Sequence, residues 1–476
     1  MAAALLTVSA DAALTEAFAR ALAPDLGAGD TLLLDGLVGA GKSHFARALI
    51  RARLGNPSED VPSPTFTLVQ TYEGMPPIWH ADLYRLSDPA EIDELGLSDA
   101  IADSIALIEW PDRMEDVPGA LTLRIMPGEN PDLRRIGLAG DPARWRRAAR
   151  ALARADFAQQ SGWGDAAVAF LAGDASSRRY YRLTRDDATA VMMDADAATL
   201  RPYLAMTEWL AQRDFDVPRI IAADRDAGLA LIEDFGDAQV ARVIEADPAC
   251  TGALYDRISG MLARLAGFPP APGILRLDGA EMARQLALFA EYYPDAAGAD
   301  ADAMAAAAEI APTFERLHQQ FCTDQKPVTS LRDFHAENII LTPDNRLGLL
   351  DFQDAVATHP AYDLVSALHD ARRDIPEHVE RAAVDRFLSE TGFDPERFHV
   401  AFALLGAQRN LRIMGIFTRL CIRDGKPRYL DFMPHVWSLI RREVAHPALT
   451  ELNALIARIP APTDAILQRI RAQCPR

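Results

Sequence analysis

Two sets of residues in this chain have the types and the spacing that phosphate chemistry requires. The first is GLVGAGKS at residues 36–43. The second is LRDFHAEN at residues 331–338, followed by DFQD at residues 351–354. The two sets belong to unrelated kinds of nucleotide site. We therefore expect two ATP sites, and two enzymes, in one chain.

The first set fits the pattern G-x-x-x-x-G-K-[ST]. In this pattern the glycines let backbone N–H groups close around a phosphate. The lysine reaches the β and γ oxygens, and the hydroxyl of the last residue can ligate Mg²⁺. An apolar run, TLLLD, precedes the motif, and a segment with helical spacing follows it. The predicted ATP-binding residues here are Gly36, Gly39, Ala40, Gly41, Lys42 and Ser43.

Hydrolysis at such a site also needs a second metal ligand and a group that orients water. Asp82 in HADLYRL and Glu109 in ALIEW stand where apolar runs end or are broken, so both are candidates. Thr65 in SPTFT is placed to sense the γ-phosphate. We expect Mg²⁺ to accompany ATP here.

The order of the segments GLVGAGKS, SPTFTLV, HADLYRL and LIEW resembles the small bacterial P-loop ATPase of the tRNA threonylcarbamoyladenosine pathway, over about residues 8–140. In that family the ATPase binds and resets the complex that makes the modification. The resemblance implies that the partners are the other subunits of that complex, with tRNA reached only indirectly. It further implies phosphate and Mg²⁺ contacts for Lys42 and Ser43, a metal ligand in Asp82, a switch-like Thr65, a hydrolytic Glu109, and Trp110 beside the nucleotide.

The second set has the spacing of a kinase catalytic loop and its metal aspartate. Asp333 and Asn338 are five positions apart, and Asp351 follows Asn338 by thirteen. Asp333 is expected to accept or orient the proton of a substrate hydroxyl, while Asn338 and Asp351 hold the metal. His335 reads as a structural or substrate-lining residue rather than the base. For Asp354 three roles stay open: a second metal ligand, a helix cap or a substrate contact.

The region before this loop supplies the expected nucleotide cover. GDASSRRYYRL at residues 173–183 reads as a loop over the phosphates, and IEDFGD at residues 232–237 reads as a hinge facing adenine. No lysine lies between residues 150 and 325, so the usual small-lobe lysine is absent, and we hypothesise that Arg178, Arg179 or Arg182 replaces it. The predicted ATP contacts are Gly173, Ser176, Ser177, Arg178, Glu233 and Phe235.

These segments, with DFQDAV, YDLVSALHDAR and QRNLRIMGIF, resemble the aminoglycoside phosphotransferase superfamily over about residues 165–435. The resemblance is closer to its branch that phosphorylates the anomeric hydroxyl of N-acetylmuramate and N-acetylglucosamine. It implies an amino-sugar substrate, for which Asp354, Arg409 and Asn410 are the predicted contacts, with Asp370, Arg372 and Gln408 nearby. A network that only packs helices is the alternative for the HDARRD and QRN segments.

Three alternatives remain open from the residues. The kinase-like half could act on an aminoglycoside, choline or another small alcohol. Its missing lysine could instead mark an inactive docking module. The P-loop half could be a nucleotide-sensing, partner-binding module with little hydrolysis of its own.

The order of the expected strands and helices predicts the fold that positions these residues. It is an α/β P-loop NTPase domain followed by a two-lobed, protein-kinase-like α+β phosphotransferase. The predicted boundaries are residues 1–140 for the ATPase, 141–160 for a linker helix, 161–240 for the small lobe and 241–476 for the helical large lobe. Asp141 and Pro142 form a good helix start. The arginine-rich helix is interpreted as a linker docked through its Trp145 face, or alternatively as a basic contact surface.

Bulk composition limits the remaining possibilities. A chain of 476 residues is too long for one hydrophobic core, and its formal charge of −19 disfavours tight unaided binding to nucleic acid. No stretch reaches the ~20 apolar residues of a membrane helix, and the N-terminus lacks the basic segment of a secretory signal. The four cysteines lie at least 53 positions apart, so we expect reduced, structural thiols in the cytoplasm.

Overall fold

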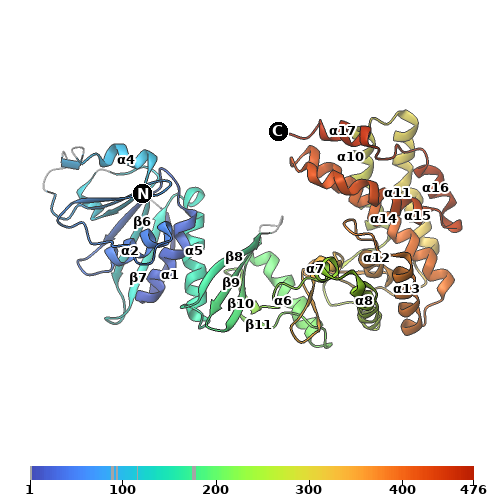
Figure 1. The fold of residues 1–476 in the computed structure, drawn as a ribbon, viewed down its shortest axis with the longest axis horizontal. Helices are drawn as coiled ribbons and strands as arrows, with labels where there is room; N and C mark the ends of the chain where they lie inside the picture. The colour runs from blue at the N-terminus through green and yellow to red at the C-terminus, as the bar shows by residue number, and fades with distance from the viewer. Residues whose placement is uncertain (1–2, 87–90, 93–94, 115, 174–177, 476) are drawn as a thin grey trace. The chain divides into compact units, whose positions relative to one another are not determined.

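A seven-stranded mixed sheet forms the N-terminal part of the computed structural model, which describes residues 3–86, 91–92, 95–114, 116–173 and 178–475 (Figure 1). Its strand order is β1-β7-β6-β2-β5-β4-β3. The strands are β1 (Ala3–Ala10), β2 (Thr31–Gly36), β3 (Val69–Tyr72), β4 (Ile78–Asp82), β5 (Ile105–Glu109), β6 (Leu121–Pro127) and β7 (Arg134–Gly140). The apolar N-terminus is thus a strand, paired antiparallel with β7.

The centre of this sheet is parallel, which decides where its polar side chains meet. β2 pairs in parallel with β5 and β6, and β4 pairs in parallel with β5. Leu34 lies opposite Glu109, and Glu109 lies opposite Asp82. The carboxyl ends of these strands therefore meet at one edge of the sheet, where ligands bind in open α/β sheets.

Helices pack on the seven-stranded sheet and bury its apolar side chains. They are α1 (Ala12–Leu22), α2 (Lys42–Leu54), the short α4 (Leu97–Asp103) and the long α5 (Pro142–Gln160). The Asp11 side chain accepts a hydrogen bond from the Leu14 amide and so caps α1. Phe18 and Phe45 are completely buried, with ring centroids 5.4 Å apart.

Helix α5 begins where the sequence predicts, with the Asp141 side chain accepting a hydrogen bond from the Ala143 amide at 2.9 Å. Trp145 is completely buried in the core beneath the seven-stranded sheet, and its Nε1 donates to the carbonyl oxygen of Gly119. The arginines of this helix are engaged by carboxylates: Arg144 and Arg147 contact Asp30, Arg146 contacts Asp196, and Arg150 and Arg154 contact Asp194. The helix is docked through Trp145, as the linker interpretation predicts, and its arginines are paired with carboxylates.

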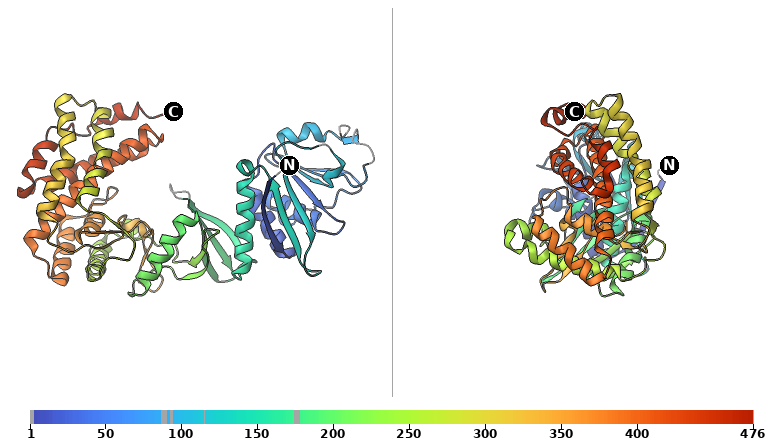
Figure 2. Two further views of the ribbon diagram at one scale, coloured as in Figure 1. Left: turned by 180° about the vertical axis from the view of Figure 1, so that it is seen from behind. Right: turned by 90° about the vertical axis from the view of Figure 1, so that its right-hand side faces the viewer.

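A five-stranded antiparallel sheet follows α5, with the order β11-β12-β10-β9-β8. Its strands are β8 (Ala167–Gly173), β9 (Arg179–Arg185), β10 (Ala188–Asp194), β11 (Ile220–Asp224) and β12 (Leu229–Glu233). Phe157 and Ala158 at the end of α5 belong to its apolar core. Figures 1 and 2 show α5 alongside both sheets, and its contacts with β1, β7 and β12 agree.

The rest of the chain is mainly helical. α6 (Ala197–Ala211) precedes α7 (Val240–Ala246), α8 (Thr251–Ala266), α9 (Gly279–Gln285), α10 (Ala287–Ala297), α11 (Ala301–Phe321), α12 (Ala361–Leu368), α13 (Glu377–Thr391), α14 (Pro395–Ile422), α15 (Met433–Val444), α16 (Thr450–Ile456) and α17 (Asp464–Arg471). Short strands β13 (Leu275–Arg276), β14 (Val328–Ser330) and β17 (Val356–Thr358) form one small sheet, and β15 (Ile339–Leu341) and β16 (Leu347–Leu349) form a hairpin. The loops between these strands hold the predicted catalytic segments, residues 331–338 and 351–354.

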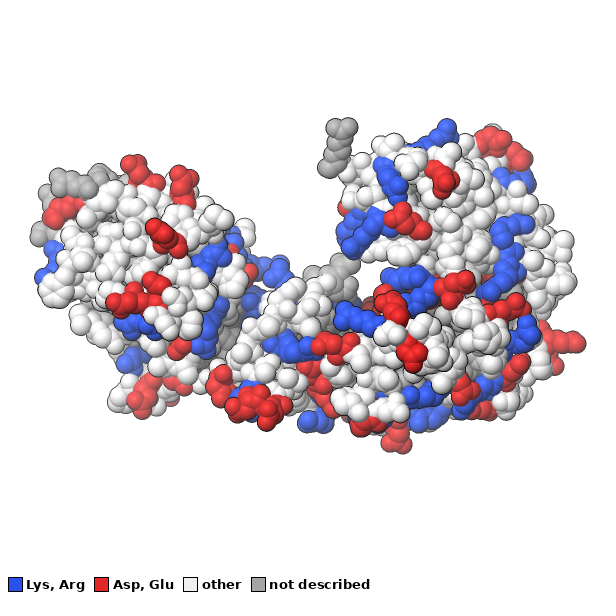
Figure 3. Space-filling view, in the orientation of Figure 1, with Lys and Arg blue, Asp and Glu red and all other residues white. Residues whose placement is uncertain are grey.

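The chain separates into two compact units. Unit 1 comprises residues 1–200 and 219–234, and unit 2 comprises residues 201–218 and 235–476. The boundaries of these units differ from the boundaries predicted from the sequence, at residues 140, 160 and 240. Figure 3 shows acidic and basic side chains interspersed on the face presented by each unit. Within the part of the chain that is described, no helix has both the length and the apolarity needed to cross a membrane.

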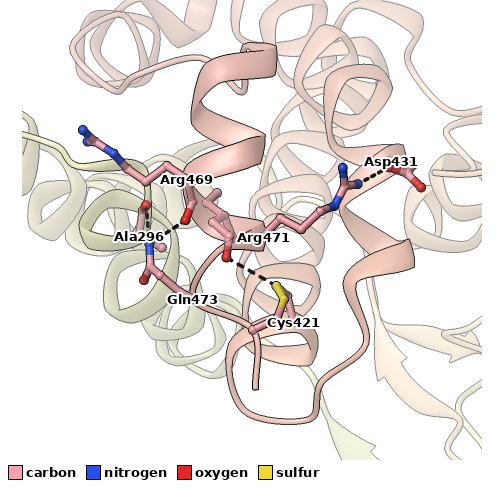
Figure 4. Close-up of a disulfide and its surroundings, with 8 residues drawn as sticks. Ala296, Cys421, Asp431, Arg469, Arg471 and Gln473 are labelled. Atoms are coloured by element: carbon pink, nitrogen blue, oxygen red, sulfur yellow. Dashed lines mark hydrogen bonds and ion pairs between the residues drawn. A yellow bond between two sulfur atoms is a disulfide. The ribbon is translucent and has the colours of Figure 1, made fainter. Parts of the chain in front are cut away.

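One sequence prediction about the cysteines is wrong. Cys421 in α14 and Cys474 after α17 form a disulfide, with Cα atoms 5.1 Å apart, whereas Cys250 and Cys322 are free (Figure 4). Gln473 donates to the carbonyl oxygen of Ala296, which holds the same terminal segment against α10. The spacing of 53 residues hid this pair, because α17 folds back on α14 only in the tertiary structure.

Candidate active sites

The P-loop joins β2 to α2 at the carboxyl edge of the seven-stranded sheet. Gly36 has a φ of 157°, and a Cβ there would lie 2.4 Å from the carbonyl oxygen of Ile125, so only glycine fits. Gly41, with a φ of 112°, is the N-cap of α2. Lys42 is 4% exposed, and its Nζ donates to the carbonyl oxygens of Gly36 at 2.8 Å and Leu37 at 3.1 Å. The lysine is thus held within the loop that should receive phosphates.

Carboxylates and hydroxyls from three other segments meet this loop. Ser43 Oγ donates to Glu109 Oε2 at 3.1 Å, and Thr65 Oγ1 donates to Asp82 Oδ2 at 2.6 Å. Burial lowers the pKa of Lys42, against the opposing effects of Glu109 and then Asp82. The structure therefore brings the predicted ligand and switch residues together around one lysine.

Aromatic rings form the remaining wall. Lys42 Nζ lies 3.8 Å from the centroid of the Trp110 ring, and the Tyr84 and Trp110 rings are 4.9 Å apart. Trp110 has a φ of 60°, which turns the chain sharply after β5. A cavity of about 390 Å³ is bounded by Val38, Gly39, Ala40, Gly41, Lys42, Ser43, His44, Arg47, Ser63, Thr65, Asp82, Tyr84, Glu109 and Trp110.

The sequence interpretation missed His80. This side chain is completely buried, and its Nε2 lies 3.0 Å from Glu109 Oε1, so Glu109 is held from one side by His80 and from the other by Ser43. Alternation along β4 places His80 on the same face of the sheet as Asp82. That alternation is the signal that could have identified it.

This donor set fits Mg²⁺ and a nucleotide phosphate. Magnesium is bound through hard oxygen ligands, and the hydroxyls of Ser43 and Thr65 with the carboxylate of Asp82 supply them. The positive φ values of Gly39 and Gly41 open the loop backbone for an anion.

In unit 2, the catalytic loop runs from β14 to β15. Asp333 is exposed, and the Asn338 side-chain amide donates to its carbonyl oxygen at 2.8 Å. Asp351 follows β16 with a φ of 56°. The side-chain amide of Gln353 donates to Asp351 Oδ1 and to Asp354 Oδ2, both at 3.0 Å. One side chain therefore holds both carboxylates in position. The carboxamide and carboxylate oxygens of Asn338 and Asp351 are ligands of the type that Mg²⁺ prefers.

Asp363 supports this loop from below, and sequence reasoning did not single it out. It is 4% exposed, and it accepts hydrogen bonds from Ser330 Oγ at 2.6 Å, the Leu331 amide at 2.6 Å and the Arg332 amide at 3.0 Å. Arg332 has a φ of 70°, an unusual conformation for a residue with a side chain. Burial raises the pKa of Asp363 to about 6, although its hydrogen bonds lower it. A carboxylate inside the apolar helix YDLVSAL was the available signal.

His335, beside this loop, is half-buried, and burial lowers its pKa. Its Nδ1 atom is buried and has no hydrogen-bond partner among the described residues. A neutral imidazole set into the loop agrees with the structural or substrate-lining interpretation.

The residues predicted to contact ATP in the kinase-like half are distributed over both units. Gly173 is the exposed last residue of β8, while Ser176 and Ser177 lie outside the described residues. Arg178 is 3% exposed, and Arg179 is exposed on β9. Glu233 Oε2 accepts from the Arg219 amide at 3.2 Å. In unit 2, Phe235 is 7% exposed and packs against Gly348.

Arg182, one of the arginines proposed to replace the missing lysine, contacts Asp234. Its Nε and Nη2 atoms contact the two oxygens of Asp234, at 2.6 and 3.0 Å. This ion pair ties β9 to the residue that follows β12.

The predicted sugar-contact segment of α14 is divided between two environments. Asn410 is completely buried and donates to Glu443 Oε1 at 2.7 Å, while Gln408 donates to the carbonyl oxygen of Met282 at 3.0 Å. His369 Nδ1 lies 2.6 Å from the same Glu443 oxygen. Asn410 thus lies inside the helical core, as the packing alternative describes. Arg409 points elsewhere and donates to the carbonyl oxygen of His369 at 3.1 Å.

Comparisons with known proteins match two separate parts of the chain. The model of the family described as "Threonylcarbamoyl adenosine biosynthesis protein TsaE" matches residues 9–136, and that of the "Phosphotransferase enzyme family" matches residues 167–399. An N-acetylmuramate/N-acetylglucosamine kinase of Caulobacter vibrioides is 38% identical over 360 residues, which cover 66% of this chain and 98% of the relative. A kinase of the same name from Pseudomonas putida is 33% identical over 328 residues, covering 64% and 93%. A tRNA threonylcarbamoyladenosine biosynthesis protein TsaE of Rickettsia bellii is 44% identical over 97 residues, covering 20% and 67%.

Proposed function

The chain belongs to two families, that of the threonylcarbamoyl adenosine biosynthesis protein TsaE in its N-terminal part and the phosphotransferase enzyme family in its C-terminal part, and we propose from this premise that it is a bifunctional enzyme. One activity is ATP hydrolysis that serves tRNA threonylcarbamoyladenosine formation. The other is ATP-dependent phosphorylation of the anomeric hydroxyl of N-acetylmuramate and N-acetylglucosamine. The β2–loop–α2 unit supports a P-loop NTPase fold, and the five-stranded sheet with the helical part supports a two-lobed kinase-like fold.

The observation that carries the kinase proposal is the match along 98% of a named amino-sugar kinase, combined with the intact set Asp333, Asn338 and Asp351. Bound Mg²⁺–ATP would supply the phosphoryl group and neutralise its charge. Asp333, exposed and fixed by the loop, accepts the proton of the sugar hydroxyl. Asn338 and Asp351 would hold the metal, and Gln353 keeps the Asp351 carboxylate in place.

In the ATPase half, Lys42 would bind the β and γ oxygens of the nucleotide, and Ser43 and Asp82 would hold Mg²⁺. Glu109, oriented by His80, is the group that positions a water molecule. Thr65 contacts Asp82 and could report the nucleotide state to the surface. We propose that the other subunits of the threonylcarbamoylation complex read this state, with tRNA contacted only through them.

The kinase proposal is tested by incubating the purified chain with ATP and a panel of N-acetylmuramate, N-acetylglucosamine, an aminoglycoside and choline, followed by mass analysis. We expect the 1-phosphates of both amino sugars. Product should persist in Lys42→Ala and vanish in Asp333→Ala. Phosphorylation of only the aminoglycoside or choline would refute the amino-sugar assignment, and no product with any acceptor would favour an inactive docking module.

The ATPase proposal is tested by phosphate release without a sugar. Hydrolysis should be lost in Lys42→Ala and Glu109→Gln and retained in Asp333→Ala. Hydrolysis that vanishes in Asp333→Ala but survives Lys42→Ala would place all turnover in the kinase half. In that case the P-loop would be a sensing module.

A further inference from the structure

Three arginines of unit 2 gather beside the candidate base. Arg332 directly precedes Asp333 in the catalytic loop. Arg409 and Arg412 stand three positions apart on α14, which places them on neighbouring sites of one helix face. The bond from Arg409 to the carbonyl oxygen of His369, at the end of α12, fixes this face next to the helix that supports the loop.

These arginines have no ion pair in the part of the chain that the structure describes. Among the described residues, no carboxylate lies within ion-pair distance of Arg332, Arg409 or Arg412, whereas the neighbouring Arg373 pairs with Glu245 at 2.9 Å. Arg409 is only 7% exposed, and the buried Nε atom of Arg332 has no hydrogen-bond partner among the residues that the structure describes. Burying guanidinium charges without a counter-ion costs free energy, so folding alone gives no reason to gather three of them.

The charges act on one another. Burial lowers the pKa of Arg412, and among its charged neighbours Arg332 and Arg409 lower it further while Asp333 raises it. An arginine remains protonated through such shifts. Three guanidinium charges therefore lie near Asp333, in a chain whose formal charge is −19.

We propose that Arg332, Arg409 and Arg412 form a subsite for a carboxylate carried by the sugar substrate. This proposal rests on the amino-sugar kinase function proposed above. N-acetylmuramate bears a lactyl carboxylate, whereas N-acetylglucosamine is neutral, and planar guanidinium groups bind carboxylates through paired hydrogen bonds. The subsite therefore sets the preference between the two sugars. A role in holding the transferred phosphoryl group would serve both sugars equally.

The test compares kcat/KM for the two sugars in the full-length chain and in Arg412→Gln. We expect the ratio of kcat/KM for N-acetylmuramate to that for N-acetylglucosamine to fall about 10- to 100-fold, the range of a charge-assisted hydrogen bond. Arg412→Lys, which keeps the charge but loses the fork, should lose less of the ratio. Arg397→Gln, an exposed arginine at the start of α14, is the matched control and should leave the ratio unchanged.

An unchanged ratio in Arg412→Gln refutes the subsite, as does an equal loss with both sugars, which would assign the arginine to the phosphoryl group or to folding. Arg409→Gln should lower the ratio in the same direction, so the proposal stays testable if one variant folds poorly. Failure of the underlying function is distinguishable, because the unmodified chain would then phosphorylate neither sugar.

Discussion

Replacing Asp363 with asparagine should disable the kinase site without touching the ATPase. The carboxylate is 4% exposed and accepts the amides of Leu331 and Arg332 together with the Ser330 hydroxyl. Asparagine has nearly the same shape, but one of its two acceptor oxygens becomes an NH₂ group. If the remaining oxygen keeps Arg332, the Leu331 amide faces a second donor and is left unsatisfied.

The size of the effect follows from these contacts. A buried amide left without an acceptor costs about 1–3 kcal/mol, and the bonds that remain lose their charge assistance. The left-handed backbone conformation of Arg332 costs about 1–2 kcal/mol, and fewer hydrogen bonds then remain to stabilise it. A loss of about 2–4 kcal/mol in loop positioning corresponds to roughly 30- to 900-fold in kcat/KM for the sugar.

The assay is sugar phosphorylation and sugar-independent ATP hydrolysis measured on the same preparation of Asp363→Asn. Only phosphorylation should fall. Asp302→Asn, which removes an exposed carboxylate paired with Arg458 in the same unit, is the matched control and should leave both rates unchanged. Phosphorylation within threefold of the unmodified chain would refute the reasoning, because the loop would then not depend on this carboxylate.

A pH profile gives an independent check. The folded pKa of about 6 lies above the unfolded value of about 3.9, so the folded chain takes up this proton first as the pH falls. The cost of burying the charge is present above pH about 6 and is relieved toward pH about 4, while the acceptor for the loop amides is lost over the same interval. We expect an acidic limb of kcat near pH 6, absent in Asp363→Asn. A limb that persists in that variant would belong to another group.

Three further outcomes are expected. Gly36→Ala should abolish binding of a fluorescent ATP analogue at the P-loop, because its Cβ would meet a carbonyl oxygen at 2.4 Å, whereas Gly39→Ala meets no atom within 4 Å and should weaken binding by only about 1–2 kcal/mol of backbone strain. Asp194→Asn should lower the melting temperature of unit 1 through a loss of about 3–5 kcal/mol, because two arginines of α5 lose their charge partner, while the exposed Asp196→Asn should not. Titration of the unfolded, unreduced chain should count two thiols, and four after reduction; four before reduction would contradict the disulfide.

The positions that sequence could predict are those fixed by local motifs. Gly36, Asp82 and Glu109 are predictable from sequence because each ends a strand at a characteristic segment, and parallel pairing of the strands brings these ends to one edge. Asp333, Asn338 and Asp351 are predicted from their spacing, which a loop and a hairpin fix. Such motifs are read along the chain, and their geometry needs no knowledge of distant packing.

The residues that sequence reasoning missed or misplaced depend on contacts between distant segments. His80 reaches Glu109 only through strand pairing, and Asp363 reaches the loop only after α12 packs beneath it. Asn410 reads as a polar group available to a sugar, yet α15 covers it and supplies Glu443. Polar side chains on a long helix do not reveal from sequence which face a neighbour will bury.

Helix α5 shows why this chain is more than two enzymes joined by a linker. Its first half completes the ATPase core through Trp145, and two of its arginines bind Asp30, the residue before β2, which leads into the P-loop. Its second half completes the core of the five-stranded sheet and binds Asp194, the last residue of β10. A flexible tether would leave each sheet to close its own core. Here one helix is part of both cores, so a substitution that unfolds α5 should destabilise both sheets of unit 1 together.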